Sequence, residues 1–337
     1  GGIFFGGVHD FGALFASVRH KGKSIGEIIS ANMSLRAKRL FIIFSYLTLI
    51  LVVAAFASIV AGTFAAKYVD GQVDLAASAT PASVAMVSLL FIVIAVAFGF
   101  MVYRRNAPMG VSTIAGVIAI CLCMAIGMNW HPIYLSNTAW MWIVGLYIAI
   151  ASVTPVWILL QPRDYLSSFL LYAMLAIAAI GVVIAHPNMV DSTGAGLVAI
   201  GDGMNAAGIK QPIFPVLFTT IACGAISGFH SLVSSGTTSK QLDKETDAKP
   251  IAYGGMLLEC VLAVITLVAI AYARQTGHTA GATDIFAGGV AGMASQIAGG
   301  NQSLFNILYT LLVLTYSAFC LTSLDTATRL ARFMFQE

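Results

Sequence analysis

Long apolar runs limit what this chain can fold into more than any other feature. Runs close to the ~20 residues that a helix needs to cross a bilayer recur along the whole chain, and only 9% of its 337 residues are charged. An ordinary soluble domain has roughly 25% charged residues. We therefore expect a multi-pass membrane protein. The predicted spans are the end of one at 1–18, followed by 40–62, 81–103, 110–129, 138–160, 165–185, 213–235, 251–273 and 303–325.

These runs favour an all-α helical bundle. Only helices and closed barrels satisfy their backbone in lipid, and the runs lack the period-two alternation of barrel strands. No low-complexity linker divides the chain, so residues 1–337 are expected to form a single transmembrane domain with about nine spans. The chain begins at Gly1 without Met or a signal peptide, and we interpret it as a fragment of a longer chain.

The Lys and Arg residues indicate the orientation. If residues 1–18 run from outside to inside, all but three of the 17 basic residues fall in inner loops, the exceptions being Lys67, Lys210 and Arg274. Cytoplasmic loops retain Lys and Arg, so this alternation supports the span count. The net charge of +3 is spread over the loops and forms no basic patch. We expect the bilayer and a small solute as partners, and no nucleic acid.

Three ionisable residues are expected near the middle of the bilayer. At ~1.5 Å per helical residue, Asp10, His230 and Glu259 each lie about 13 to 15 Å from basic residues that mark the inner surface. The hydrocarbon core is roughly 30 Å thick. An ionisable group at its centre costs at least ~2.5 kcal/mol unless it faces protein, a partner or water. The common depth of the three residues predicts a shared polar cavity.

Each of these residues has a structural alternative. Asp10 either carries a proton or a cation, or it satisfies an interhelical hydrogen bond. His9 and Asp10 are consecutive and are not expected to face one point, so one serves the cavity and the other a neighbouring helix. Glu259 has no local cation, which favours proton loading and release. Structural hydrogen bonding is its main alternative, and metal ligation a weaker one.

A polar segment, GFHSLVSSGTTSKQ at 228–241, follows an apolar run. The low helix propensity of Ser234 to Thr238 predicts an unwound stretch whose oxygens coordinate a solute or cation. The alternative is a continuous helix whose hydroxyls bond back to the backbone and whose small residues let another helix approach. The candidate solute- and ion-binding residues of this region are Ser227, His230, Ser231, Ser234, Ser235, Thr237 and Thr238.

Three other features suggest helix ends, gates or lids. In QPRDYLSS, at 161–168, Pro162 is expected to end one helix and Asp164 to cap the next, with an inner gate at Arg163 and Asp164 as the alternative. Asp325, with Arg329 four residues later, predicts a surface salt bridge or a helix-end role. The outer segments 186–212 and 274–302 are predicted to be Gly-rich loops or lids, and residues 284–299 could form a short helix.

Four stretches together resemble the carbon starvation protein A family of bacterial inner-membrane transporters. They are GGVHDFGALFASVRHKGKSIGEI, LLQPRDYLSSFL, GAISGFHSLVSSGTTSKQLDKETDAKPIAYGGMLLE and SLDTATRLARFMFQE. The resemblance implies peptide uptake during nutrient stress or, as in some members, proton-coupled pyruvate uptake. It also implies a five-plus-five inverted repeat with discontinuous helices. Members carry further residues before the point where this chain starts, so part of the site is expected to lie outside it.

The polar cluster favours a secondary transporter without a cofactor. Protons are the expected coupling ion and sodium the alternative, because hydroxyl and carbonyl oxygens suit either. The sequence has no Walker motif for ATP. An intramembrane hydrolase using His230 with Ser234 or Ser235 would lack a nucleophile elbow and an oxyanion loop. A channel or a sensor is the third hypothesis, although no filter sequence is visible.

Overall fold

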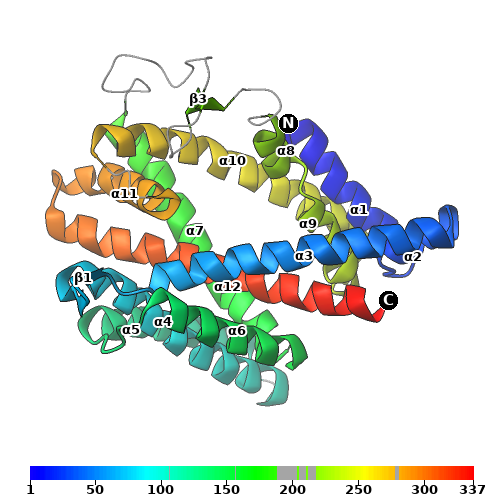
Figure 1. Ribbon diagram of the computed structural model, residues 1–337, viewed down its shortest axis with the longest axis horizontal. Helices are drawn as coiled ribbons and strands as arrows, with labels where there is room; N and C mark the ends of the chain where they lie inside the picture. Colours follow the sequence, from blue (N-terminus) through cyan, green and yellow to red (C-terminus); the bar gives the residue numbers. More distant parts are fainter. Residues whose placement is uncertain (106, 156, 188–202, 205–209, 212–217, 278–280) are drawn as a thin grey trace. The chain divides into compact units, whose positions relative to one another are not determined.

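The computed structural model describes residues 1–337 apart from 106, 156, 188–202, 205–209, 212–217 and 278–280. The described chain is predominantly helical (Figure 1). Its elements are η1 Gly2–Gly6, α1 Gly7–Arg19, α2 Ile25–Asn32, α3 Leu35–Phe64, β1 Tyr68–Val69, β2 Gln72–Val73, α4 Leu75–Gly99, η2 Phe100–Arg104, α5 Met109–Asn129, α6 Asn137–Val153, α7 Leu160–Ala185, β3 Gly203–Met204, β4 Lys210–Gln211, α8 Phe218–Ala225, α9 Gly228–Gly236, η4 Thr238–Lys240, η5 Glu245–Asp247, α10 Ala248–Gln275, α11 Ala282–Ser295, η6 Gln296–Ala298 and α12 Gln302–Gln336.

The chain divides into two compact units. Unit 1 comprises Gly1–Leu49, Asn188–Ala271 and Leu330–Glu337, and unit 2 comprises Ile50–Pro187 and Tyr272–Arg329. Among the described residues, six helices are long and apolar enough to cross a membrane. They are Leu35–Phe64, Leu75–Arg104, Met109–Asn129, Leu160–Ala185, Glu245–Gln275 and Gln302–Gln336. The chain is therefore an all-α, multi-pass membrane protein.

Three of the predicted spans differ from uniform transmembrane helices. The run at 138–160 contains a helix of only 17 residues, α6, which ends at Val153. Thr154, which precedes a proline, is extended with φ −66° and ψ 137°, as residues before proline usually are. The described part of 213–235 is split between α8 and α9. The run at 1–18 is a π-helical turn, η1, continued by α1.

Local signals explain several element boundaries. Ser24 begins α2 and its hydroxyl accepts a hydrogen bond from the Glu27 amide at 3.2 Å, in the Ser-x-x-Glu pattern of a capping box. The Asp74 carboxylate accepts from the Ala77 amide at 3.0 Å and caps α4. Strands β1 and β2 pair through a turn at Asp70 and Gly71, whose φ values of 50° and 79° suit an Asp-Gly hairpin turn.

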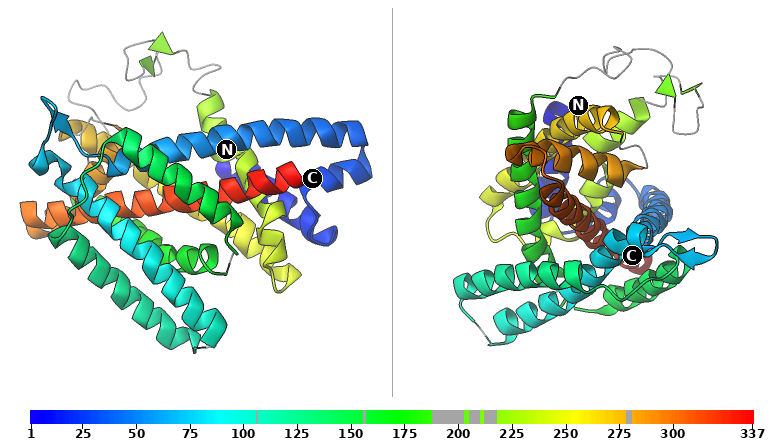
Figure 2. Two further views of the ribbon diagram at one scale, coloured as in Figure 1. Left: turned by 60° about the horizontal axis from the view of Figure 1, so that its bottom comes forward. Right: turned by 90° about the vertical axis from the view of Figure 1, so that its left-hand side faces the viewer.

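In unit 2 the core lies among α4, α5 and α7. It is formed by Phe91, Phe98, Ile120, Leu166 and Leu170. Both views of Figure 2 show α5 beside α4. A Cβ at Gly127 of α5 would lie 3.3 Å from the Ser83 carbonyl oxygen of α4, so a small residue allows this close packing, as is typical between membrane helices.

Helix α11 also packs against α7 in unit 2. A Cβ at Gly181 would lie only 3.1 Å from the Ala294 backbone nitrogen. The short helix predicted in segment 274–302 is therefore present as α11, and its residues 287–291 are buried. Most of the predicted lid at 186–212 lies outside the described residues.

The predicted turn at 161–168 is wrong. Helix α7 begins at Leu160, and Pro162 lies in its first turn, where the missing amide hydrogen would have no helical partner in any case. Asp164 is consequently inside the helix and does not cap it. The chain turns earlier, at residues 157–159, directly before α7.

Candidate ion-coupling site

Four titratable side chains from three helices meet in unit 1. His9 and Asp10 lie on α1, His230 on α9 and Glu259 on α10. Asp10 Oδ1 is 3.0 Å from His9 Nδ1, and Asp10 Oδ2 is 3.0 Å from His230 Nδ1. His230 Nε2 is 3.9 Å from Glu259 Oε2. We call His9, Asp10, His230 and Glu259 the titratable cluster.

The cluster confirms that Asp10, His230 and Glu259 converge, and it corrects one expectation about His9. Consecutive helical side chains were expected to diverge, yet the His9 imidazole bonds to the neighbouring Asp10 carboxylate. The contact is possible because a carboxylate has two oxygens, which can accept hydrogen bonds from different directions. Asp10 therefore joins two imidazoles.

Small residues bring the three helices of the cluster together. A Cβ at Gly7 would lie 2.7 Å from the Tyr253 ring on α10, so a glycine is needed for this approach of α1. On the other side, the Ser17 hydroxyl of α1 donates to the Ser235 carbonyl of α9 at 3.4 Å. Both serines are fully buried. This packing places Asp10 between His9 and His230.

The helix carrying His230 is discontinuous, but the break is not where the sequence predicts it. Helix α8 ends at Ala225, Ser227 is extended with φ −82° and ψ 118°, and α9 begins at Gly228. His230 thus lies in the first turn of α9. The predicted unwinding of Ser234 to Thr238 is wrong for its first part, because α9 remains helical to Gly236.

Backbone contacts of the hydroxyls explain why this serine-rich stretch stays helical. The Ser231 hydroxyl donates to the Gly228 carbonyl at 2.8 Å, and the Ser235 hydroxyl donates to the Ser231 carbonyl at 3.0 Å. Ser234 is also buried. Thr237 follows the end of α9, and Thr238 begins the short 3-10 turn η4. Ser231 and Ser235 therefore serve the helix backbone, as in the structural alternative.

The geometry of the cluster suits proton transfer. The exposed fraction of the side chain rises from 10% for Asp10 to 33% for His230 and 45% for Glu259. A neutral His230 that donates from Nδ1 to Asp10 presents an unprotonated Nε2 toward Glu259. Because 3.9 Å exceeds a hydrogen bond, a small approach or one water would connect the two groups. A proton can then be held by Glu259 or by His230.

A second group of charged residues is buried in unit 2. Arg163 Nη1 is 2.6 Å from Asp325 Oδ2, and both side chains are 1% exposed. The Tyr147 hydroxyl donates to the same Asp325 oxygen at 2.7 Å, and Arg163 Nη1 donates to Tyr147. We call Tyr147, Arg163 and Asp325 the buried triad.

The buried triad corrects the predicted roles of Asp325 and Arg163. Asp325 lies inside α12, which continues to Gln336, and it is buried rather than part of a surface salt bridge. Arg329 donates to the carbonyls of Ala151 and Thr154 at 3.4 and 2.9 Å. Sequence reasoning missed Tyr147, for which an isolated phenol within an apolar run was the available signal.

The family profile and the similar proteins give the same family for this chain. The profile of the family described as carbon starvation protein CstA matches residues 1–280 and 272–337. Peptide transporter CstA of Campylobacter jejuni is 30% identical over 392 residues, which cover 100% of this chain and 53% of the relative. Peptide transporter CstA of Mycobacterium tuberculosis is 34% identical over 283 residues, which cover 82% of this chain and 35% of the relative.

A relative that is named for a different solute is also similar to this chain. Pyruvate/proton symporter BtsT of Escherichia coli is 33% identical over 279 residues, which cover 80% of this chain and 35% of the relative. No solved structure matches the chain. The chain spans about half the length, or less, of these three relatives.

Proposed function

Because this chain belongs to the carbon starvation protein CstA family, we propose that it is part of a secondary active transporter of the bacterial inner membrane. Small peptides are the proposed solute, supported by relatives named as peptide transporters. Pyruvate is the alternative, supported by the similarity to a pyruvate/proton symporter. Protons are the proposed coupling ion, and sodium is the alternative.

The titratable cluster is the observation that carries this proposal. Ionisable groups within membrane helices are costly, and they commonly mark ion pathways and proton relays. Here two carboxylates and two imidazoles meet across α1, α9 and α10. Glu259 is the twelfth residue of α10, about 17 Å from its start at ~1.5 Å per residue, and so it is far from either end of the helix.

Coupling follows if the solute binds one protonation state better than the other. A ligand shifts a conformational equilibrium only by its difference in affinity for the two states. A proton on Glu259 or His230 changes the charge beside α9, and α9 follows the break at Ser227. Discontinuous helices of this kind are usual at transporter binding sites. The break also supports the proposed five-plus-five inverted repeat.

The test is uptake by the complete protein in proteoliposomes with an imposed pH gradient. Labelled dipeptides, tripeptides and pyruvate are offered in competition to the wild type, to Glu259→Gln and to the control Glu27→Gln, whose side chain is exposed beside Lys23. We expect Glu259→Gln to lose accumulation by at least about tenfold, because an amide does not carry a transferable proton. The control should match the wild type.

The solute that displaces the others identifies the substrate class. Uptake by Glu259→Gln equal to that of the wild type at every pH would contradict a role of Glu259 in proton coupling. Accumulation driven by a sodium gradient and insensitive to the pH gradient would replace the proposed ion with sodium.

A further inference from the structure

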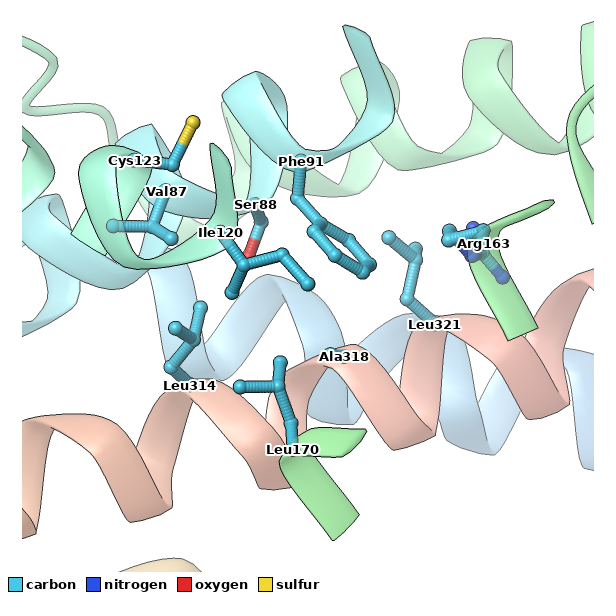
Figure 3. A pocket seen from close by; sticks show the side chains of 10 residues that line it. All are labelled: Val87, Ser88, Phe91, Ile120, Cys123, Arg163, Leu170, Leu314, Ala318 and Leu321. Carbon is cyan, nitrogen blue, oxygen red and sulfur yellow. The ribbon is translucent and has the colours of Figure 1, made fainter. Parts of the chain in front are cut away.

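The cavity beside Arg163 in unit 2 is too small for a ligand larger than water (Figure 3). Its volume is about 10 Å³, which is the room for about one water molecule. Apolar side chains such as Phe91 and Leu321 line it. A larger surface lies on the outside of unit 1, along the first half of α3.

Two arginines lie at the start of α3 without partners. The Ser34 hydroxyl accepts a hydrogen bond from the Ala37 amide at 3.2 Å and so caps the helix, which places Arg36 and Arg39 in its first two turns. Residues three positions apart lie on the same face of a helix, and both arginines are exposed. Neither forms an ion pair or a hydrogen bond within the described part of the chain.

This arrangement is electrostatically unfavourable without an anion. Like charges three or four residues apart repel each other, and cations are disfavoured at the N-terminus of a helix. Carboxylates of the same unit are placed elsewhere. Glu27 is 3.8 Å from Lys23, and the Glu337 carboxylate packs beside Gly26 of α2. The two guanidinium groups are therefore available to an anion from outside the described chain.

An exposed apolar stripe continues from the two arginines along α3. The residues four, seven, eight and eleven positions after Arg36 share its helix face. They are between 59% and 71% exposed, and we call them the α3 stripe: Leu40, Ile43, Phe44 and Leu47. Helix α3 is long and apolar enough to cross a membrane. The α3 stripe thus lies at the depth of acyl chains, and the arginines lie at the level of the headgroups.

The combination of two cations and an apolar stripe selects an anionic phospholipid. The oxygens of a phosphodiester suit guanidinium groups, and Lys and Arg clusters beside a membrane helix attract anionic lipids. A free phosphate would contact the arginines and leave the α3 stripe uncovered. A zwitterionic lipid would cover the stripe without compensating both charges.

We propose that Arg36 and Arg39 bind the phosphodiester group of an anionic phospholipid whose acyl chains lie along the α3 stripe. Each arginine should contribute about fivefold to the affinity, as basic residues beside an anionic membrane surface do. The site is separate from the titratable cluster, which lies on α1, α9 and α10, and it does not depend on which solute is transported.

The first test compares two lipids with the same acyl chains. The complete wild-type protein, purified in a neutral detergent, is titrated with dioleoyl phosphatidylglycerol or with dioleoyl phosphatidylcholine, and bound lipid is measured by native mass spectrometry. We expect the anionic lipid to bind on the order of tenfold or more tightly. Excess inorganic phosphate should not displace it, because phosphate does not contact the α3 stripe. Equal Kd values for the two lipids, or displacement by phosphate, would overturn the proposal.

The second test uses variants with a matched control. Arg36→Gln with Arg39→Gln should raise the Kd for phosphatidylglycerol on the order of tenfold or more and leave phosphatidylcholine binding unchanged. The control, Lys244→Gln with Lys249→Gln, removes the same charge from exposed positions of the same unit outside the α3 stripe. It should stay within about a factor of two of the wild type.

Arg39→Gln alone should raise the Kd for phosphatidylglycerol about fivefold, and it reports on the site if the double variant folds poorly. Binding of phosphatidylglycerol to the folded arginine variants as tight as to the wild type would place the lipid elsewhere. An equal loss in the lysine control would mean that overall charge, and not a site on α3, attracts the lipid. Either result would overturn the proposal.

Discussion

Asp10→Asn is expected to abolish proton-driven accumulation of solute, with a loss of at least about a hundredfold, the lower range for removing a proton-transfer group. Asp10 accepts from both His9 and His230, and so it fixes the tautomer that turns His230 Nε2 toward Glu259. An asparagine of the same size has one oxygen and one NH₂ group. It can accept from one imidazole only and holds no proton for transfer.

The measurement compares pH-gradient-driven uptake with exchange of labelled for unlabelled solute at equal pH. Exchange needs solute binding but no net proton movement, so Asp10→Asn should retain it. Asp243→Asn, at an exposed position of the same unit, is the matched control and should keep both activities. Accumulation by Asp10→Asn within a factor of about two of the wild type would contradict proton transfer through the cluster.

Asp325→Asn is expected to lose about 3 to 5 kcal/mol of stability, because it removes the carboxylate that is paired directly with the buried guanidinium of Arg163. Both side chains of this pair are 1% exposed, so neither water nor salt can compensate. The triple variant Tyr147→Phe, Arg163→Leu and Asp325→Leu removes both charges together with the hydroxyl that bonds to them. It should be close to the wild type in stability, since apolar replacements of a buried ion pair are often neutral or stabilising.

Melting of the detergent-purified protein measures this effect, together with the yield of folded protein. Asp70→Asn is the control, because Asp70 is exposed and its φ of 50° is tolerated by asparagine. If Asp325→Asn has the same melting temperature as the control, the ion pair of Arg163 and Asp325 is not essential to the stability of the fold. If the triple variant loses as much stability as Asp325→Asn, the loss is due to packing and not to an unpaired charge.

Physical regularities of the sequence were sufficient to predict the six long apolar helices of the described chain and the convergence of Asp10, His230 and Glu259. The length of the apolar runs and the distribution of the basic residues predicted the spans. The thickness of the bilayer sets the length of a spanning run, and Lys and Arg are retained in cytoplasmic loops. The helical distance from the basic residues of the inner surface gave a common depth for Asp10, His230 and Glu259. The structure brings these three side chains together. The shared depth was informative because an ionisable side chain inside the bilayer has a high free-energy cost when it is alone.

Pairing partners and exact helix ends could not be predicted in the same way. Nothing local relates Arg163 to Asp325, which is 162 positions later in the numbering and is paired with it only in the folded chain. Pro162 was taken for a helix end, although proline is also favoured in the first turn. The proline that coincides with the end of α6 is Pro155, concealed in an apolar run.

The segment at 228–241 shows how side-chain contacts override propensity. Serine and glycine disfavour helix, yet the hydroxyls of Ser231 and Ser235 bond to carbonyls of their own helix. The actual break, at Ser227, carries a residue type common at helix starts before Gly228. The Ser227 side chain makes no capping bond there.

The central claim is that the titratable cluster moves a proton with each solute. It is tested most directly by recording the internal pH of proteoliposomes containing the complete wild-type protein, without sodium, after solute is added outside. We expect prompt internal acidification that saturates with solute and is absent in Asp10→Asn. Solute entry without acidification, or acidification unchanged in Asp10→Asn, would contradict it.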